Sequence, residues 1–166
     1  MARLTPKFSS GRSVREYTEA HYLPAAARYC DRAADGGRHG AELLALRQAL
    51  ERGWDTAAFG NLDIRSDGNE HSFAVEVDLG SLDPGRVQVE LYADGQNGSA
   101  AFRQAMTRGA RLSGAGNRFR YAATTAGARP PSDFTPRLVP GLAGAVPVLE
   151  VPLILWFERP RGSAHA

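Results

Sequence analysis

The sequence predicts an α+β fold, in which an N-terminal helical hairpin precedes an antiparallel, immunoglobulin-like β-sandwich of about seven strands. Apolar residues recur with a period of about 3.6 up to Gly53 and with a period of 2 beyond Trp54. Turn sequences then follow at short intervals, with no helical pattern between them. We therefore expect a helical segment over residues 1–55, a β-sandwich over 56–158 and a disordered tail over 159–166.

Two helices are expected between residues 13 and 53. Ser13 with Glu16 three positions later matches a capping box, which predicts a helix start just before Val14. Pro24 should kink this helix or start a new one, since proline lacks the N–H that the helix interior needs. Gly36-Gly37 should end it. Three leucines at helical spacing form the apolar stripe of the second helix: Leu43, Leu46 and Leu50.

Seven strands are expected, because apolar and polar residues alternate or because turn signals bound a short segment. Val75 and Val77 share one parity and are expected in the core. Pro136 and Pro140 are expected on an edge strand, where a missing ladder donor is tolerated. The strands are centred on residues 62–64, 73–79, 87–91, 101–108, 117–125, 133–139 and 152–158.

The composition excludes several classes of protein. The 20 basic and 18 acidic residues give a net charge of +2 without a basic run, so we expect no nucleic-acid binding. No apolar run approaches the roughly 18 residues of a membrane span, and the first residues, MARLTPKFSS, lack the apolar core of a signal peptide. Cys30 is the sole cysteine, which excludes an internal disulfide. We expect a cytoplasmic location.

The opening stretch LTPKFSSGRSVREYTEAHYLPAA resembles the final helical segment of the bacterial α-glucan (glycogen or maltodextrin) phosphorylases of glycosyltransferase family 35. Later stretches, VEVDLGSLDPGRVQVELYADG, RPPSDFTPRLVP and VPLILW, resemble the β-rich extension that one bacterial branch carries after that helix. The residues that match the helical motif are Phe8, Ser9, Ser10, Arg12, Glu16 and Tyr17.

The resemblance implies a parent enzyme that transfers glucose from α-1,4-glucan ends to phosphate with pyridoxal phosphate. In the family the cofactor lysine ends a Gly-Met-Lys stretch, whereas the single lysine here, Lys7, follows Leu-Thr-Pro. We therefore expect this chain to hold no cofactor and to be non-catalytic. Its expected partner is the phosphorylase catalytic core, and Met1 is expected to be a truncation point or an internal start.

Three residues of the first helix, Arg12, Arg15 and Tyr17, are candidates for docking this closing helix onto the core. The guanidinium group offers several donors in a fixed fork, which suits contacts between domains. A solvated helix face would have the same sequence, and the residues themselves leave both interpretations open.

Two aromatic residues of the sandwich are candidates for contact with α-glucan or with a neighbouring domain. Tyr92 has the parity of Gln88 and Glu90, opposite to that of Leu91, and Trp156 has the parity opposite to Leu155. Both rings are therefore expected to point away from the core, where they can stack on sugars or fill an interface.

Two other functions compete with the phosphorylase interpretation. One is a free-standing carbohydrate-binding module that uses Tyr92 or Trp156. The other is a small hydrolase that uses carboxylates among Glu76, Asp78 and Glu90, although strict alternation places such residues at solvent positions anyway. The four histidines lie far apart in the sequence, without metal-ligand spacing.

Overall fold

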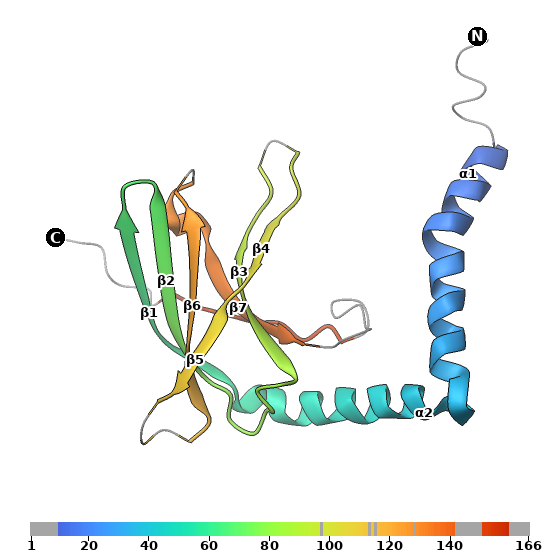
Figure 1. Ribbon diagram of the computed structural model, residues 1–166, viewed down its shortest axis with the longest axis horizontal. Helices are drawn as coiled ribbons and strands as arrows, with labels where there is room; N and C mark the ends of the chain where they lie inside the picture. Colours follow the sequence, from blue (N-terminus) through green and yellow to red (C-terminus); the bar gives the residue numbers. More distant parts are fainter. Residues whose placement is uncertain are drawn as a thin grey trace, which may run out of the picture. The chain divides into compact units, whose positions relative to one another are not determined.

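The computed structural model describes residues 10–96, 98–112, 114, 116–127, 129–141 and 151–159. The chain divides into two compact units, Met1–Arg47 and Gln48–Ala166, and each is considered by itself. The fold is α+β, with helical structure followed by antiparallel strands in two sheets (Figure 1). The expected segments 1–55 and 56–158 stay predictions, and the expected tail lies, from residue 160 onward, outside the described residues.

The first unit contains α1 (Ser10–Tyr17), a π-helical turn η1 (Thr18–Tyr22) and most of α2 (Leu23–Gly53). The predicted hairpin is wrong, because α2 continues as one long helix over residues 23–53. The interruption expected at Gly36-Gly37 is present, since the backbone angles are non-helical from Ala34 to Gly37. A helical hairpin is held by two apolar stripes that cover each other. Here α1 and η1 have no buried residue, and α2 buries only Leu50 and Gly53.

The helix start and the effect of Pro24 also differ in detail from expectation. The chain is already helical at Ser10, so the predicted start at Val14 is wrong. Ahead of Pro24 the helix widens into η1, in which the Leu23 N–H bonds to the Thr18 carbonyl, five residues back. This local change in pitch is a common response to a proline that cannot donate to the preceding turn.

The second unit holds two four-stranded antiparallel sheets. In the first sheet the strand order is β1 (Ala58–Asp67), β2 (Glu70–Asp78), β6 (Arg118–Ala126), β5 (Thr107–Arg111). In the second the order is β4 (Phe102–Ala105), β3 (Val87–Ala93), β7 (Thr135–Pro140), β8 (Leu155–Trp156). Two short 3₁₀ turns, η2 (Trp54–Thr56) and η3 (Pro131–Asp133), precede β1 and β7.

On one side of the sandwich, the polypeptide chain passes directly from one sheet to the other. The segment expected as one strand over 101–108 is two strands, β4 and β5, which belong to different sheets. Figure 1 shows β4 leading into β5 where the chain changes sheet. Met106 lies between these strands, is buried, and donates its N–H to the Val89 carbonyl at 2.8 Å. The opposite side of the sandwich is bounded by the edge strands β1 and β8, and it remains open.

The core lies between the sheets, as the alternation predicts. Val75 and Val77 of β2 have no exposed surface, and Val89 and Leu91 of β3 face them with at most 1 % exposure. Each such residue alternates with a polar or small neighbour on the outer face. The other large side chains that are fully buried are Phe73, Leu79, Phe134, Pro136, Leu138 and Leu50.

The expected edge position of the two strand prolines is wrong. Pro136 and Pro140 lie on β7, which runs between β3 and β8 and is buried. Their missing N–H groups are tolerated because β8 is only two residues long and pairs with Arg137 and Leu138 alone. The β7–β8 ladder therefore contains neither proline.

Candidate ligand groove

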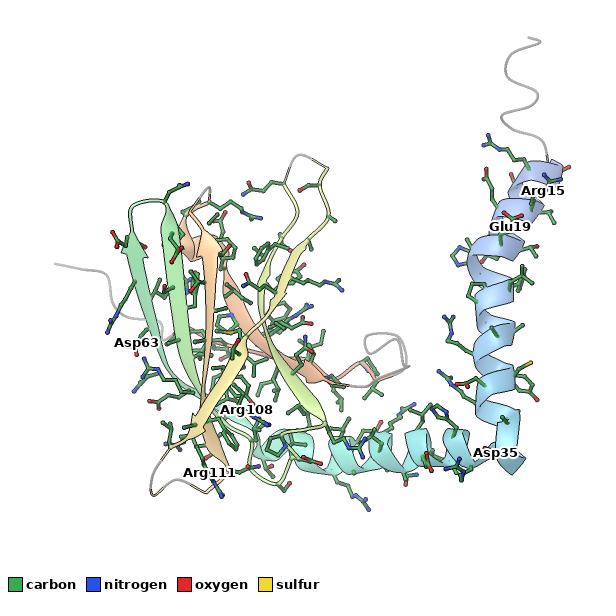
Figure 2. The ribbon with its side chains drawn as sticks, viewed as in Figure 1. Arg15, Glu19, Asp35, Asp63, Arg108 and Arg111 are labelled. Carbon is green, nitrogen blue, oxygen red and sulfur yellow. The ribbon has the colours of Figure 1, made fainter. Side chains whose placement is uncertain are left out.

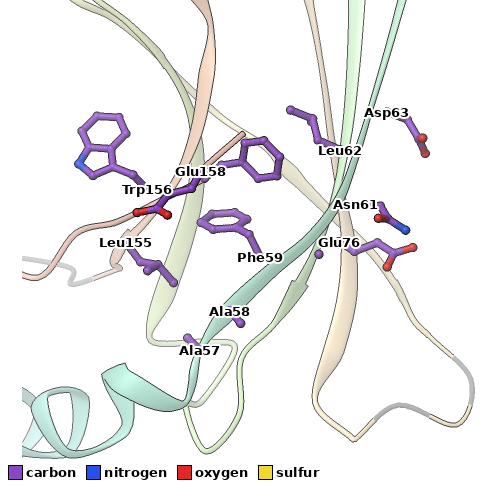
Figure 3. Close-up of a pocket in the computed structure, with 12 residues that line it drawn as sticks. Ala57, Ala58, Phe59, Asn61, Leu62, Asp63, Glu76, Leu155, Trp156 and Glu158 are labelled. Carbon is purple, nitrogen blue, oxygen red and sulfur yellow. The ribbon is translucent and has the colours of Figure 1, made fainter. Parts of the chain in front are cut away.

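A groove with a volume of about 790 Å³ opens on the side of the sandwich where the chain does not join the sheets. Its size lies within the range of about 300–1,000 Å³ that small-molecule sites occupy. Figure 3 shows Trp156 and Glu158 on one side of it and Asn61, Asp63 and Glu76 on the other. Its lining comes from residues 57–63 around β1, from Glu76 of β2 and from residues 155–158 around β8.

Two phenylalanines form the apolar floor of the groove. The rings of Phe59 and Phe157 meet edge to face, with centroids 5.9 Å apart and planes at 86°. Phe59 precedes an irregularity in the β1–β2 ladder between Phe59 and Leu62, after which Leu62 again faces inward opposite Val75. The irregularity keeps both apolar side chains on the same face although they are three residues apart.

The polar part of the groove carries amide and carboxylate groups. Asn61, Asp63, Glu76 and Glu158 line it, and none of the twelve lining residues is lysine, arginine or histidine. Asp63 accepts a hydrogen bond from Nη2 of Arg120, which neutralises one of the carboxylates. Anionic ligands are therefore disfavoured, whereas hydroxyl groups can be bound by the amide and the carboxylates above an apolar floor.

Trp156 links the groove to a second cluster on the outer face of the β3–β7–β8 sheet. Its ring meets that of Tyr92 edge to face, with centroids 5.3 Å apart. The guanidinium carbon of Arg137 lies 4.3 Å from the Tyr92 ring centroid and 5.3 Å from that of Trp156. Both Nε and Nη2 of Arg137 donate to Oε2 of Glu90, at 3.0 and 2.7 Å. The four side chains hold one another in fixed positions.

The exposed ends of this cluster are the two aromatic residues. Trp156 remains 40 % exposed, whereas Arg137 is only 5 % exposed. The Tyr92 hydroxyl donates to Oδ1 of Asp94 at 2.9 Å, and this hydrogen bond raises the pKa of Tyr92. The planes of Tyr92 and Trp156 cross at 77°, so the rings form a corner rather than a flat platform, with Trp156 turned to the groove.

The structure brings Tyr92 and Trp156 together, but it separates the carboxylates considered for hydrolysis. Glu90 is bound by Arg137 on the outer face of one sheet, whereas Glu76 and Asp78 lie on the outer face of the other. Asp78 is engaged by Arg118 at 3.3 Å. No two of these carboxylates from different strands share a cleft, so the arrangement does not support the hydrolase interpretation.

The three predicted docking residues lie on α1 in the first unit. Nε of Arg12 is 3.2 Å from Oε1 of Glu16, one helical turn away. Tyr17 is 57 % exposed, and its ring centroid lies 4.7 Å from that of His21 and 5.5 Å from that of Tyr22, both in η1. Figure 2 shows Arg15 projecting from the helix. Their role in docking stays a prediction.

Sequence reasoning missed Phe59, Phe157 and Arg137. The two phenylalanines are almost a hundred positions apart, and no local pattern indicates that β1 and β8 border the same opening. Arg137 has the same parity as Thr135, so alternation could have placed it on the outer face. Its burial depends on the neighbouring rings, which only the strand order brings to it.

Comparison with protein-family models and with curated proteins found no match. Within the part of the chain that the structure describes, no three His, Cys, Asp or Glu side chains are grouped so that they could hold a metal ion. No helix in the same residues has both the length and the apolar character to cross a membrane.

Proposed function

We propose that this chain is the C-terminal, non-catalytic region of a pyridoxal-phosphate-dependent α-glucan phosphorylase of glycosyltransferase family 35. In this proposal the first unit docks on the catalytic core. The second unit, an immunoglobulin-like sandwich, contributes stability and a contact with α-glucan. The sequence resemblance suggests the family, and the observation that carries the proposal is the bare apolar surface of the helical unit.

We include a cytoplasmic location, because the sole cysteine, Cys30, leaves no internal disulfide of the kind that oxidising compartments favour.

The helical unit exposes large apolar side chains along its length. A helix recovers the cost of its nucleation mainly by burying an apolar face. In α1, η1 and the first turns of α2, the described residues bury none. A partner surface would cover them, and the motif residues Arg12, Glu16 and Tyr17 lie on the same segment. The exposed side chains are Val14 at 65 %, Tyr17 at 57 %, Tyr22 at 64 %, Leu23 at 60 % and Tyr29 at 73 %.

The residues of this chain do not fit the cofactor of the family. Pyridoxal phosphate needs a lysine amine for its Schiff base and donors for its phosphate. The only lysine, Lys7, stands outside a Gly-Met-Lys context and outside the described residues. The groove has carboxylates instead of cations and therefore does not suit a phosphate. No catalytic step is assigned to this chain.

A free-standing carbohydrate-binding module is the second candidate, and the groove is the observation that favours it. Aromatic rings next to amide and carboxylate groups suit the apolar faces and hydroxyls of a sugar. Trp156 supplies a ring that is already fixed by Arg137 and still 40 % exposed. In this case the chain alone would bind maltodextrin and would need no catalytic partner.

The docking proposal is tested with a bacterial family-35 phosphorylase from which the corresponding C-terminal region has been deleted. We expect the purified 166-residue chain to bind it in isothermal titration calorimetry, and Tyr17→Ala to weaken binding about tenfold or more. Leu44→Ala is the control, since Leu44 is 55 % exposed but lies beyond the break at Ala34–Gly37 and outside the segment that is proposed to dock. Equal losses for both variants, or no binding, would contradict docking through the motif.

The same preparation tests the absence of catalysis. The chain alone should form no pyridoxal phosphate adduct after borohydride reduction, and it should release no glucose 1-phosphate from maltodextrin and phosphate. Turnover by the chain alone would overturn the proposal. Maltodextrin binding by the chain, combined with failure to bind the truncated enzyme, would favour the free-standing module.

A further inference from the structure

Among the described residues, the first strand of the sandwich is a long edge strand that has no partner strand on one side. β1 spans ten residues, more than any other described strand, and it pairs only with β2. Its inward-facing Ile64 is 38 % exposed, and no residue of the strand is fully buried. An exposed edge of this length offers a row of backbone donors and acceptors to another strand.

The turn after β1 determines which backbone groups point to the free edge. Asp67 and Glu70 pair across the two-residue turn Gly68-Asn69, in which Gly68 has a φ of +56°. Residues that close a two-residue hairpin turn exchange hydrogen bonds with each other. Counting back from Asp67, every second residue of β1 therefore directs its N–H and C=O groups to β2. These residues are Arg65 and Asp63. The N–H and C=O groups of the residues between them, Leu62, Ile64 and Ser66, point outward.

The outer face of β1 carries a charge pattern that complements itself. Asp63 and Arg65 flank Ile64, and both side chains lie on the face opposite to the core. In an antiparallel pair of two β1 strands centred on Ile64, Asp63 of each chain stands opposite Arg65 of the other. This is a non-hydrogen-bonded pair, in which side chains come closest. Figure 2 labels Asp63 on β1, and its carboxylate accepts a hydrogen bond from Arg120 on the same outer face of the sheet.

A pairing whose centre is shifted by one residue in either direction is electrostatically unfavourable. A pair centred on Asp63 brings two aspartates together, and a pair centred on Arg65 brings two arginines together, so like charges would stand opposite each other. The register centred on Ile64 also places both copies of Leu62, Ile64 and Ser66 in hydrogen-bonding positions. It lies entirely within the regular part of the β1–β2 ladder, from Leu62 to Asp67.

We propose that two copies of this chain associate through β1, in an antiparallel register centred on Ile64. The four-stranded sheet then continues across a two-fold axis as an eight-stranded sheet. Asp63 already accepts a hydrogen bond from Arg120 of its own chain, and Arg65 of the second copy adds a further donor to the same carboxylate. Ile64 of each chain covers the other. The association is argued without the proposed function, because it uses neither the groove floor nor the helical unit, although Leu62 and Asp63 also line one side of the groove.

Sedimentation equilibrium at rising concentration, from micromolar to millimolar, tests the proposal on the full chain. The mass should rise from 17.8 kDa toward twice that value. Arg65→Asp places two acidic residues opposite each other and should raise the dimer Kd about tenfold or more. Asp63→Arg should have the same effect through paired arginines. Arg103→Asp is the matched control, with the same change of charge on the exposed edge strand β4.

Mixing the two weakened variants gives the sharpest outcome. A chain with Asp63→Arg carries arginine at both positions, and a chain with Arg65→Asp carries aspartate at both, so they complement each other only in this register. We expect a heterodimer at least as tight as the wild-type dimer, and circular dichroism should show that each variant is folded. A monomeric wild-type chain at millimolar concentration, or a mixture that stays monomeric, would overturn the proposal.

Discussion

Arg137 lies over the ring of Tyr92, with 4.3 Å between its guanidinium carbon and the ring centroid, and it is bound on its polar side by Glu90. The side chains of Arg137 and Glu90 are only 6 % and 15 % exposed. Removal of one member of a buried pair leaves a charge without compensation, which costs more than the loss of an exposed pair. The cluster therefore combines positioning of the aromatic rings with a contribution to stability.

Glu90→Gln should lower the free energy of unfolding by about 2–4 kcal/mol, because the Arg137 charge stays buried without its counter-charge. Chemical denaturation followed by tryptophan fluorescence measures the change. Asp78→Asn is the control, since its partner Arg118 is 43 % exposed and Asp78 itself 36 %. Loss of that exposed pair should cost about 0–1 kcal/mol. Equal losses for the two variants would contradict the importance of burial.

Tyr121 should make the stability sensitive to alkaline pH. Its hydroxyl is buried without a hydrogen-bond partner among the described residues, and burial raises the pKa above the ordinary value of 10.0, although Arg108 lowers it in part. The phenol then ionises more readily in the unfolded chain. The protonated Tyr121 hydroxyl therefore makes its full contribution to the free energy of unfolding below pH 10. This contribution is lost as the pH rises from 10 toward the raised pKa of the folded state.

Tyr121→Phe should consequently reduce the loss of stability above pH 10, and near pH 7 it should change the free energy of unfolding by only about −0.5 to +1 kcal/mol. Denaturation curves at several pH values give the slope. Tyr29→Phe serves as control, because Tyr29 is 73 % exposed. An unchanged alkaline slope in Tyr121→Phe would be inconsistent with this role.

Gly80 should tolerate no side chain. It has a φ of +53°, and a β-carbon there would overlap with the Thr56 side chain and carbonyl. Gly80→Ala should destabilise the second unit by about 2–4 kcal/mol in thermal melts, since both the backbone and Thr56 must shift. Gly68→Ala is the control, because Gly68 has a similar φ of +56° but open space around it. Its cost should be only about 1 kcal/mol.

Trp156→Ala should weaken the binding of maltoheptaose by the chain about tenfold, through loss of the exposed ring at the groove. Isothermal titration calorimetry or ligand-observed NMR measures the Kd. Tyr29→Ala removes an exposed ring far from the groove in sequence and should leave the Kd unchanged. Wild-type affinity in Trp156→Ala would mean that the groove does not bind glucan through this ring.

Local patterns predicted much of the second unit. Alternation predicted which residues of β2 and β3 enter the core, because successive side chains of a strand point to opposite faces whatever the neighbouring strand is. The same parity placed Tyr92 and Trp156 on the outer face. The hairpin was predicted wrongly, because the single stripe of Leu43, Leu46 and Leu50 shows that a helix has an apolar face but not what covers it.

The sequence by itself determined the α+β class, the position of most strands and the outward parity of the two aromatic residues. Each of these depends on the nearest neighbours along the chain. The tertiary structure alone decided that β1 and β8 border one opening, that Phe59 meets Phe157, and that Arg137 is buried between two rings. These contacts join residues far apart in the sequence. They depend on the order of strands in the sheets, and that order follows from the packing of the whole core.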